Sequence, residues 1–274
     1  MTPALTLDRV SCTFETPGRP PYTALAETTL RIAQGEFVSV VGPTGCGKST
    51  LLNIAAGLLA PTTGQVTVGD EPVRGVNRHA GYLFQAEALM PWRSALSNVC
   101  TGLEYRGVKR PEAEARAQEW LRRVGLGDHG HRFPHQLSGG MRKRVALAQT
   151  LILDPAIILM DEPFSALDVQ TRLLMENELL ALWAPEQPPG APPVDRKSVL
   201  FITHDLEEAI SLSDRVLILS SGPATTVVGE FPIDLPRPRD VAEIRMQPGF
   251  LELHRQIWAA MKHEVLKAYA RQID

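Results

Sequence analysis

The stretch "GPTGCGKST", residues 42–50, lies between the apolar run "FVSVV" and the segment "LLNIAAGLL", which has a helical pattern. It matches G-x-x-x-x-G-K-[ST], in which glycines let backbone N–H groups wrap a polyphosphate and the next helix points its positive N-terminus at that anion. Lys48 adds a mobile positive charge for the outer phosphates and for catalysis, and the Ser49 hydroxyl suits Mg²⁺. The predicted nucleotide-binding loop consists of Gly42, Pro43, Thr44, Gly45, Cys46, Gly47, Lys48, Ser49 and Thr50.

Composition narrows the class of protein. The chain has 274 residues, of which 44% are hydrophobic, as in an ordinary globular protein. Its net charge of −3 gives no basic field, so no nucleic-acid partner is expected. No apolar stretch approaches the roughly 18 residues that span a bilayer, and the N-terminus does not resemble a signal peptide. Three scattered cysteines, without metal-ligand spacing, suit a reducing compartment, so we expect the chain in the cytosol.

The pattern of apolar residues predicts an α/β fold. Residues 5–14 and 28–32 are typical of an antiparallel β subdomain at the N-terminus. The continuous apolar run 36–41 then predicts a buried parallel strand, and later strands alternate with helices. These later strand candidates are residues 81–84, 156–160, 198–203 and 215–219. The sequence therefore predicts a P-loop NTPase core with a mainly parallel sheet.

The rest of the chain is assigned to the same single domain, residues 1–274, as additions to this core. Helical patterns fill an inserted subdomain at about 86–155, and the predicted helices are residues 94–105, 111–124 and 138–152. The proline-rich stretch 184–193 is expected to be a surface loop. A C-terminal helix at about 249–270 is expected to pack on the domain with one face, formed by Phe250, Leu253, Ile257, Trp258, Met261 and Val265.

The stretch "LSGGM", residues 137–141, predicts a second anion site. Ser138 is placed as an N-cap, and Gly139 and Gly140 leave the first N–H groups of the helix free of side chains. A plain capped helix would explain the serine but not two glycines, which each cost about 1 kcal/mol in a helix. Residues 142–144, "RKR", are expected to form a solvated face, with nucleotide attraction as the alternative.

The stretch "AIILMDEP", residues 156–163, predicts the catalytic acids. It is an apolar strand that ends in two carboxylates, and ligands bind at the carboxyl ends of parallel strands. Asp161 would face Mg²⁺, and Glu162 is the natural general base for an attacking water. Simple turn residues are the alternative when this stretch is considered alone.

The order of these motifs resembles the ATP-binding subunits of ABC transporters over nearly all of the chain. The motifs are the loop at 42–49, Gln85, "LSGG" at 137–140, "ILMDE" at 158–162, "SALD" at 165–168 and "THD" at 203–205. The resemblance implies that Gln85 binds Mg²⁺ and reports the nucleotide state to a membrane partner, and that Asp168 is the D-loop acid of the nucleotide site. It also implies that His204 holds the γ-phosphate and water. Phe14 matches the aromatic residue that stacks on adenine, with Tyr22 as a weaker candidate.

A narrower resemblance, to nitrate, sulfonate and taurine importers, comes from residues 87–108 and from "LPRPRD" at 235–240. It implies an integral membrane permease that docks near Gln85 and the helical subdomain, with Leu89 and Trp92 at the contact or in the core. A periplasmic or extracellular solute-binding protein would be an indirect partner. The chain would lie peripherally on the cytoplasmic face of the inner membrane. Lys143, Gln149 and Thr150 depart from the usual family residues, which puts helix-surface contacts in doubt.

Two phosphate-binding helix starts on one chain predict a mechanism. One ATP is not easily held by both if the inserted subdomain separates them, so two chains would face head to tail and close on two ATP molecules. We therefore expect ATP and Mg²⁺ as cofactors and a homodimer, or a dimer with a close paralogue, that couples ATP hydrolysis to solute import. An exporter, a soluble ABC ATPase and a P-loop kinase or GTPase are the alternatives.

Overall fold

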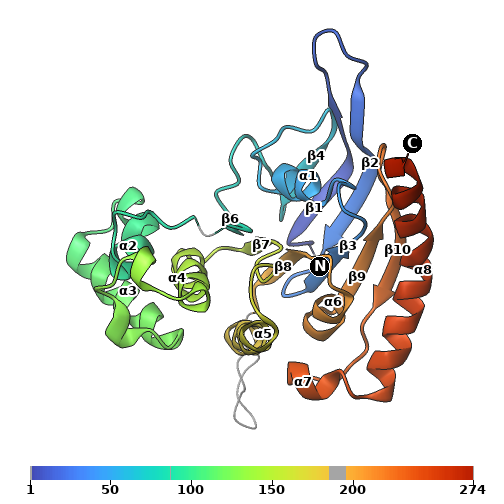
Figure 1. The fold of residues 1–274 in the computed structure, drawn as a ribbon. Coiled ribbons are helices and arrows are strands. Elements are labelled where there is room, and N and C mark those ends of the chain that lie inside the picture. The colour runs from blue at the N-terminus through green and yellow to red at the C-terminus, as the bar shows by residue number, and fades with distance from the viewer. Residues whose placement is uncertain (1, 87, 185–195, 274) are drawn as a thin grey trace.

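Two β-sheets and an outlying group of helices make up the fold of the computed structural model, which describes residues 2–86, 88–184 and 196–273 (Figure 1). The larger sheet has the strand order β10-β9-β3-β8-β7-β6. Its strands are β3 (Phe37–Val41), β6 (Ala80–Leu83), β7 (Ile157–Asp161), β8 (Ser198–Ile202), β9 (Arg215–Leu219) and β10 (Val227–Pro232). All neighbours are parallel except β10, which is antiparallel to β9. The predicted α/β core with a mainly parallel sheet is confirmed.

The smaller sheet is antiparallel and has the order β2-β1-β4-β5. Its strands are β1 (Leu5–Phe14), β2 (Tyr22–Ile32), β4 (Thr63–Val68) and β5 (Glu71–Pro72). Strands β4, β5 and β10 are not predicted from the sequence. Half of β4 is exposed, and exposed and half-buried residues make up β5 and β10, so none of the three has the apolar run that indicates a buried strand.

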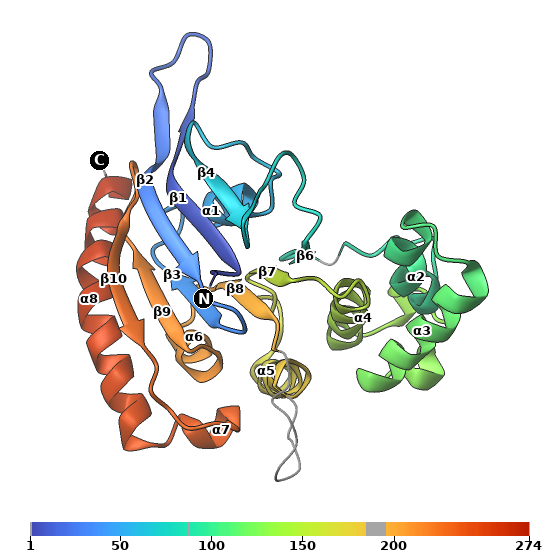
Figure 2. The ribbon, with the colours of Figure 1, turned by 180° about the vertical axis from the view of Figure 1, so that it is seen from behind.

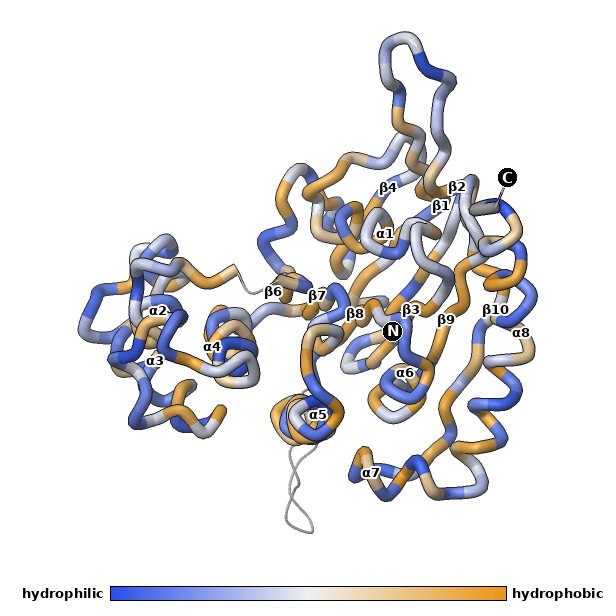
Figure 3. Tube along the Cα trace, viewed as in Figure 1, coloured by the Kyte–Doolittle hydropathy of each residue, from blue (hydrophilic) through white to orange (hydrophobic). Residues whose placement is uncertain are grey.

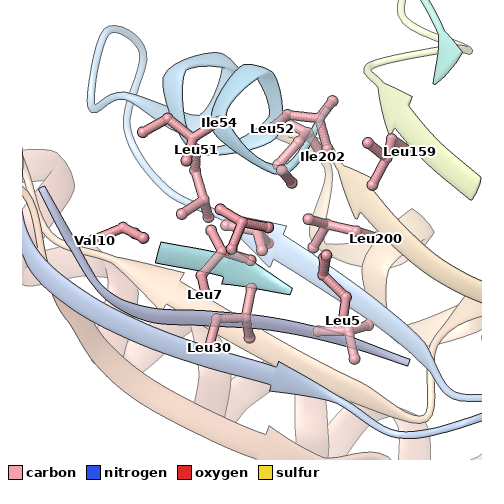
Figure 4. Packing of buried hydrophobic residues seen from close by; sticks show 14 of the residues in the cluster. Leu5, Leu7, Val10, Leu30, Leu51, Leu52, Ile54, Leu159, Leu200 and Ile202 are labelled. Atoms are coloured by element: carbon pink, nitrogen blue, oxygen red, sulfur yellow. The ribbon is translucent and has the colours of Figure 1, made fainter. Parts of the chain in front are cut away.

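Helix α1 (Lys48–Ala55) fills the space between the two sheets. Its leucines and isoleucine pack against β1 and β2 on one side and against β7 and β8 on the other (Figure 4). The labelled members of this cluster are Leu5, Leu7, Val10, Leu30, Leu51, Leu52, Ile54, Leu159, Leu200 and Ile202. The start of α1 is therefore fixed by the main core.

The opposite face of the larger sheet is covered by helices. Phe37 and Phe201 point to this face, away from α1, and pack against α5 (Val169–Trp183). Helix α6 (Leu206–Leu212) packs beside it with α7 (Val241–Ile244), seen from both sides in Figures 1 and 2. The sheet interior is almost wholly apolar, which appears as the orange strands in Figure 3. Because β3 and β8 are buried on both faces, they lack an alternating pattern.

The outlying helices lie between β6 and β7 in the chain. They are α2 (Ala95–Tyr105), α3 (Arg110–Arg123) and α4 (Gly139–Leu151), with short 3-10 helices at Gly127–His129 and Pro134–Gln136. These helices have an apolar cluster of their own. Helix α4 also contributes Ala146, Leu147 and Leu151 to the cluster under the larger sheet, so it joins the helical group to the core.

The long helix α8 (Pro248–Ile273) follows β10 along the outer edge of the sheet (Figure 1). Phe250, Ile257 and Met261 are buried against it, as predicted for this face. The prediction is wrong for Trp258, which is 43% exposed because it directly follows Ile257 and lies at the border of the buried stripe. The predicted loop at 184–193 lies, after Ala184, outside the described residues.

Candidate functional site

The loop between β3 and α1 forms a ring of backbone around the Lys48 ammonium. Lys48 is buried, and its Nζ donates hydrogen bonds to the carbonyl oxygens of Gly42 at 2.9 Å and Pro43 at 3.0 Å. Gly47 caps α1 with φ +94°, which a side chain rarely allows. A Cβ on Gly42 would lie 2.9 Å from Cys46 Sγ, so this turn has no space for one. The loop is a tight backbone cradle with a positive charge at its centre.

Cys46 lies inside this loop with 1% of its surface exposed. Burial raises the pKa of its thiol, although the neighbouring Lys48 opposes the effect. A protonated, covered thiol is a poor nucleophile. Cys46 therefore acts as a small packing residue of the loop.

The Ser49 hydroxyl and the Asp161 carboxylate meet where α1 and β7 come together. Ser49 Oγ donates to Asp161 Oδ1 at 3.1 Å, and Tyr82 Oη donates to Asn53 Oδ1 at 3.1 Å beside them. Burial raises the pKa of Asp161, while the hydrogen bond from Ser49 lowers it. A divalent cation would favour the charged carboxylate here, and Mg²⁺ prefers hard oxygen ligands.

The set of protein ligands at this position is small. Within the part of the chain that the structure describes, no three His, Cys, Asp or Glu side chains form a metal cluster. Mg²⁺ commonly binds one or two protein oxygens and completes its shell with phosphate oxygens and water. The Ser49 and Asp161 pair thus fits Mg²⁺ bound together with a polyphosphate.

Glu162 and His204 meet at the carboxyl ends of two adjacent parallel strands, β7 and β8. His204 Nδ1 lies 2.9 Å from Glu162 Oε2. The Glu162 backbone has φ +41° and is held by a hydrogen bond from its N–H to Ile202 O at 2.9 Å. The Glu162 side chain is 21% exposed and that of His204 is 55% exposed, so both reach solvent. This pair has the geometry of a carboxylate and an imidazole that share one proton-transfer site.

Gln85 follows β6 and connects to the same turn. Its Nε2 donates to Ser165 Oγ at 3.4 Å, and Ser165 Oγ donates to Glu162 O at 3.0 Å. The backbone carbonyl of Gln85 accepts a hydrogen bond from Lys143 Nζ. Gln85 is therefore linked to Glu162 through Ser165, a residue of the "SALD" motif whose contact is not predictable from residue spacing.

The stretch 142–144 is not the solvated face that the sequence predicts. Lys143 is only 2% exposed. Arg142 Nη1 donates to Leu137 O at 3.0 Å, and Arg144 Nη2 lies 2.5 Å from Glu178 Oε1 on α5. The prediction is wrong because tertiary contacts, which charge alone does not show, turn Lys143 toward the loop after β6 and Arg144 toward α5.

The start of α4 has the predicted cap. Ser138 Oγ accepts a hydrogen bond from Met141 N at 3.3 Å. A Cβ on Gly139 would meet no atom closer than 3.9 Å, whereas one on Gly140 would lie 2.9 Å from Thr171 Cγ2. Glycine at 140 has a packing reason within the chain, and glycine at 139 has none.

The starts of α1 and α4 are separate in the fold. Helix α1 packs in the cluster between the two sheets, whereas α4 packs in the clusters on the opposite face and in the helical group. Figures 1 and 2 show the two helices apart in both views. The chain thus carries two side-chain-poor helix starts at different places on its surface.

Asp168 is the N-cap of α5. Its Oδ1 accepts from Thr171 N at 3.0 Å and its Oδ2 from Thr171 Oγ1 at 2.7 Å. These hydrogen bonds lower the pKa of Asp168. The residue is exposed, so its carboxylate stays charged at the protein surface.

The predicted aromatic residues lie on the surface. Phe14 and Tyr22 face each other across β1 and β2 and are 42% and 48% exposed. Trp92 is 74% exposed, while Leu89 is half-buried against two apolar clusters. Phe14 and Trp92 are therefore available to a ligand or partner, and Leu89 belongs partly to the core. No helix in the described ranges is long and apolar enough to cross a membrane.

Comparison with known proteins gives a consistent result. The ABC transporter family matches residues 25–165. An uncharacterized ABC transporter ATP-binding protein of Methanocaldococcus jannaschii is 45% identical over 245 residues, which are 89% of this chain and 86% of the relative. The taurine import ATP-binding protein TauB of Yersinia pestis is 44% identical over 77% of this chain and 78% of its own.

Solved structures agree with these sequences. A dimeric ATP-binding cassette in a post-hydrolysis state, bound to ADP and Pi, superposes with a TM-score of 0.71 at 32% identity. The match covers 85% of this chain and 100% of that one. A second dimeric structure of the same bacterial cassette gives a TM-score of 0.71 at 33% identity.

Proposed function

The chain belongs to the ABC transporter family, and we propose that this ATPase is the energy-coupling subunit of an importer for a small anionic or organic solute. Its ATPase class follows from the family. The import direction is favoured by the similarity to a taurine import ATP-binding protein. The solute would be nitrate-, sulfonate- or taurine-like.

ATP would bind in the loop at residues 42–50. The Lys48 ammonium, which the Gly42 and Pro43 carbonyls hold in this structure, would turn to the outer phosphates. Thr50, the last residue of the loop, would complete the phosphate site. The exposed ring of Phe14 would stack on adenine. Ser49 and Asp161, with Gln85 from the neighbouring loop, would hold Mg²⁺. Bound Mg²⁺ supplies positive charge that offsets the charge of the phosphates.

Hydrolysis would depend on Glu162 and His204. Glu162 would accept a proton from the attacking water, and His204 would hold the water and the γ-phosphate in line. The 2.9 Å separation of Nδ1 and Oε2 supports this division of roles, because both groups can then reach one water. Lys48 would stabilise the developing charge on the phosphate oxygens.

The observation that carries the proposal is the separation of the starts of α1 and α4 on one chain. A single triphosphate would be closed by the α4 start, Ser138 to Gly140, only if that start came from a second chain. Asp168 would lie beside it at the same junction. The dimeric state of the solved cassettes supports this arrangement. Closure on binding and opening after hydrolysis would drive transport.

The membrane permease would dock beside Gln85 and the helical group. The half-buried Leu89 and the exposed Trp92 follow Gln85 in the chain and give an apolar contact. Lys143 on α4 holds the Gln85 carbonyl, so a movement of the helical group would reach the loop after β6. The chain would then work at the cytoplasmic face of the membrane, with a solute-binding protein on the other side of the permease.

The first experiment tests the dimer. Glu162→Gln should bind MgATP without turning it over, and light scattering coupled to size exclusion should show a dimer at saturating MgATP. Glu162→Gln combined with Lys48→Ala, which cannot hold the phosphates, should remain monomeric. A monomeric Glu162→Gln chain at saturating MgATP would contradict the two-chain site.

The second experiment tests import. The chain is co-expressed with a candidate permease and solute-binding protein, and the purified assembly is reconstituted in liposomes. Uptake of taurine, nitrate or an alkanesulfonate that needs ATP on the cassette side is the expected result. ATP-dependent export, or failure of the chain to bind a permease, would contradict the import function.

A further inference from the structure

The guanidinium of Arg172, in the first turn of α5, joins two loops of the candidate site. Its Nη2 donates to Leu167 O at 3.3 Å, and its Nη1 donates to Asp205 Oδ2 at 3.1 Å. Its Nε forms an ion pair with Glu208 Oε1 at 3.6 Å, a separation too long for a hydrogen bond. The side chain is 23% exposed, so these contacts are partly shielded from solvent. Arg172 connects the backbone beside Asp168 to the start of α6.

The same cluster fixes both chain neighbours of His204. Thr203 Oγ1 donates to Glu208 Oε2 at 2.6 Å and accepts from Asp205 N at 3.0 Å. Asp205 Oδ1 caps α6 by accepting from Glu207 N at 2.8 Å. Thr203 and Glu208 are almost fully buried, whereas the ring of His204 is 55% exposed. The backbone on each side of His204 is thus fixed by these hydrogen bonds, while the imidazole ring projects into the site.

We propose that Arg172 is a positioning residue for ATP hydrolysis, which ties the Leu167–Asp168 turn to Thr203 and Asp205 and so fixes His204 beside Glu162. The inference rests on the proposed function. In the proposed dimer, Asp168 lies at the junction with the second chain. Arg172 would therefore make the placement of His204 depend on the position of the turn that meets the partner.

The chemistry of arginine suits this task. Its planar fork donates in two directions at once, to Leu167 O and to Asp205 Oδ2, which a single ammonium does not reproduce. Partly buried ion pairs are weak sources of stability, because desolvation offsets their attraction. Stability alone therefore gives little reason for charged groups at this position. Alignment of the His204 ring gives a direct reason, because a small misplacement of a catalytic group costs up to about 10²-fold in rate.

The kinetic test compares Arg172→Ala with a matched control, Arg215→Ala. Arg215 is similarly exposed, at 20%, and also pairs with two carboxylates, Glu36 and Glu230, but it lies at the amino end of β9, at the opposite edge of the sheet. Arg172→Ala should lower kcat for MgATP at least about tenfold and change KM less than about twofold. Arg215→Ala should leave kcat within about twofold of the wild type, whatever its effect on Tm.

A second measurement does not depend on turnover. The imidazole nitrogen chemical shifts of His204, assigned with His204→Ala, should change in Arg172→Ala and stay unchanged in Arg215→Ala. Arg172→Lys, which keeps the charge without the fork, should give an intermediate kcat and serves in place of Arg172→Ala if that variant does not fold.

The outcomes distinguish failure of the Arg172 positioning role from failure of the proposed catalytic site. A folded Arg172 variant with wild-type kcat, or with unchanged His204 shifts, would overturn the positioning role. If Glu162→Gln hydrolyses ATP normally, the proposed site fails instead, and the His204 shifts still decide whether Arg172 orients the histidine.

Discussion

His204 Nδ1 and Glu162 Oε2 lie 2.9 Å apart because β7 and β8 are paired in register, with Asp161 opposite Ile202. Glu162 directly follows Asp161, the last residue of β7. His204 comes two residues after Ile202, the last residue of β8. The Glu162 N–H bonds to Ile202 O, so the sheet hydrogen bonding continues to the base of the pair. The register of the sheet therefore brings the two turns side by side, and the contacts around Thr203 and Asp205 hold the histidine there.

The first prediction concerns the histidine. His204→Ala should lower kcat by about 10²- to 10³-fold, because one of the two groups proposed to hold the water is removed. The affinity for MgATP should change little, since the loop at residues 42–50 is intact. Steady-state hydrolysis and fluorescent-nucleotide titration measure the two effects. His131→Ala, at an exposed residue of the helical group, is the control and should behave as the wild type. Normal turnover in His204→Ala would contradict the assignment.

The second prediction separates folding from assembly at the start of α4. Gly139→Ala has space for its Cβ and should raise the stability of the isolated chain by about 0.5–1 kcal/mol, since alanine favours a helix. The same methyl group should hinder the phosphate of the second chain, so the nucleotide-driven dimer and hydrolysis should be lost. Calorimetry and light scattering measure these. Gly140→Ala should instead lower Tm, because its Cβ would lie 2.9 Å from Thr171 Cγ2. A Gly139→Ala chain that dimerises normally on MgATP would refute the two-chain contact.

The third prediction concerns adenine. Phe14→Ala should weaken ATP binding by about three- to tenfold, which corresponds to the roughly 0.5–1.5 kcal/mol of an aromatic stack. Because Phe14 is 42% exposed, its removal should change Tm little. Titration with ATP and with inorganic tripolyphosphate provides the comparison, since only ATP has a base to stack. Equal losses for both ligands would exclude stacking, and a loss in Tyr22→Ala alone would transfer the role to Tyr22.

The fourth prediction is a pH dependence of stability. Burial raises the pKa of Glu176 to about 8, opposed by Arg245, whose Nη2 lies 2.9 Å from its Oε2. Glu208 and Asp205 nearby raise it further, and Arg172 opposes them. The unfolded carboxyl titrates near 4.3, so between about pH 4 and 8 the folded state binds the extra proton. This contribution to stability is complete at low pH and is lost as the pH rises through 8.

Glu176→Gln should remove that component. The free energy of unfolding of the wild type should fall with rising pH in this window by up to about 1.4 kcal/mol per unit more steeply than that of Glu176→Gln. Urea unfolding at a series of pH values between about 6 and 8 measures the slopes. Glu252→Gln is the control, because Arg255 and Gln256 lower the pKa of Glu252 and its effect lies at acidic pH. Parallel slopes for wild type and Glu176→Gln would refute the prediction.

Much of the fold was predictable because burial on both faces leaves a strong mark on sequence. The strands β3, β7 and β8 are continuous apolar runs, and Ser138 directly precedes a helical pattern. Strand β4 was missed because its register with β1 depends on a distant segment: a Cβ on Gly64 would lie 2.3 Å from Arg9 O. Such contacts between remote residues leave no local period.

The sequence names the residues of the candidate site but not the contacts that connect them. Motif order placed Gln85, Glu162 and His204 together, yet neither Ser165 as the link to Gln85 nor the burial of Lys143 followed from composition. A lysine beside two arginines is most often solvated, and only the position of the loop after β6 turns it inward. Hydrogen bonds that join separate elements depend on side-chain direction, which residue spacing does not give.

Selection for heat resistance alone would act against Glu162. Its left-handed backbone, φ +41°, is a conformation that glycine and asparagine adopt at lower cost, and such strain amounts to about 1–3 kcal/mol. A library screened only for survival at high temperature would drift toward those residues and, given the proposed role of Glu162, lose its capacity for turnover. The chain retains a carboxylate at a position where folding would prefer another residue, which is how natural enzymes often exchange robustness for activity.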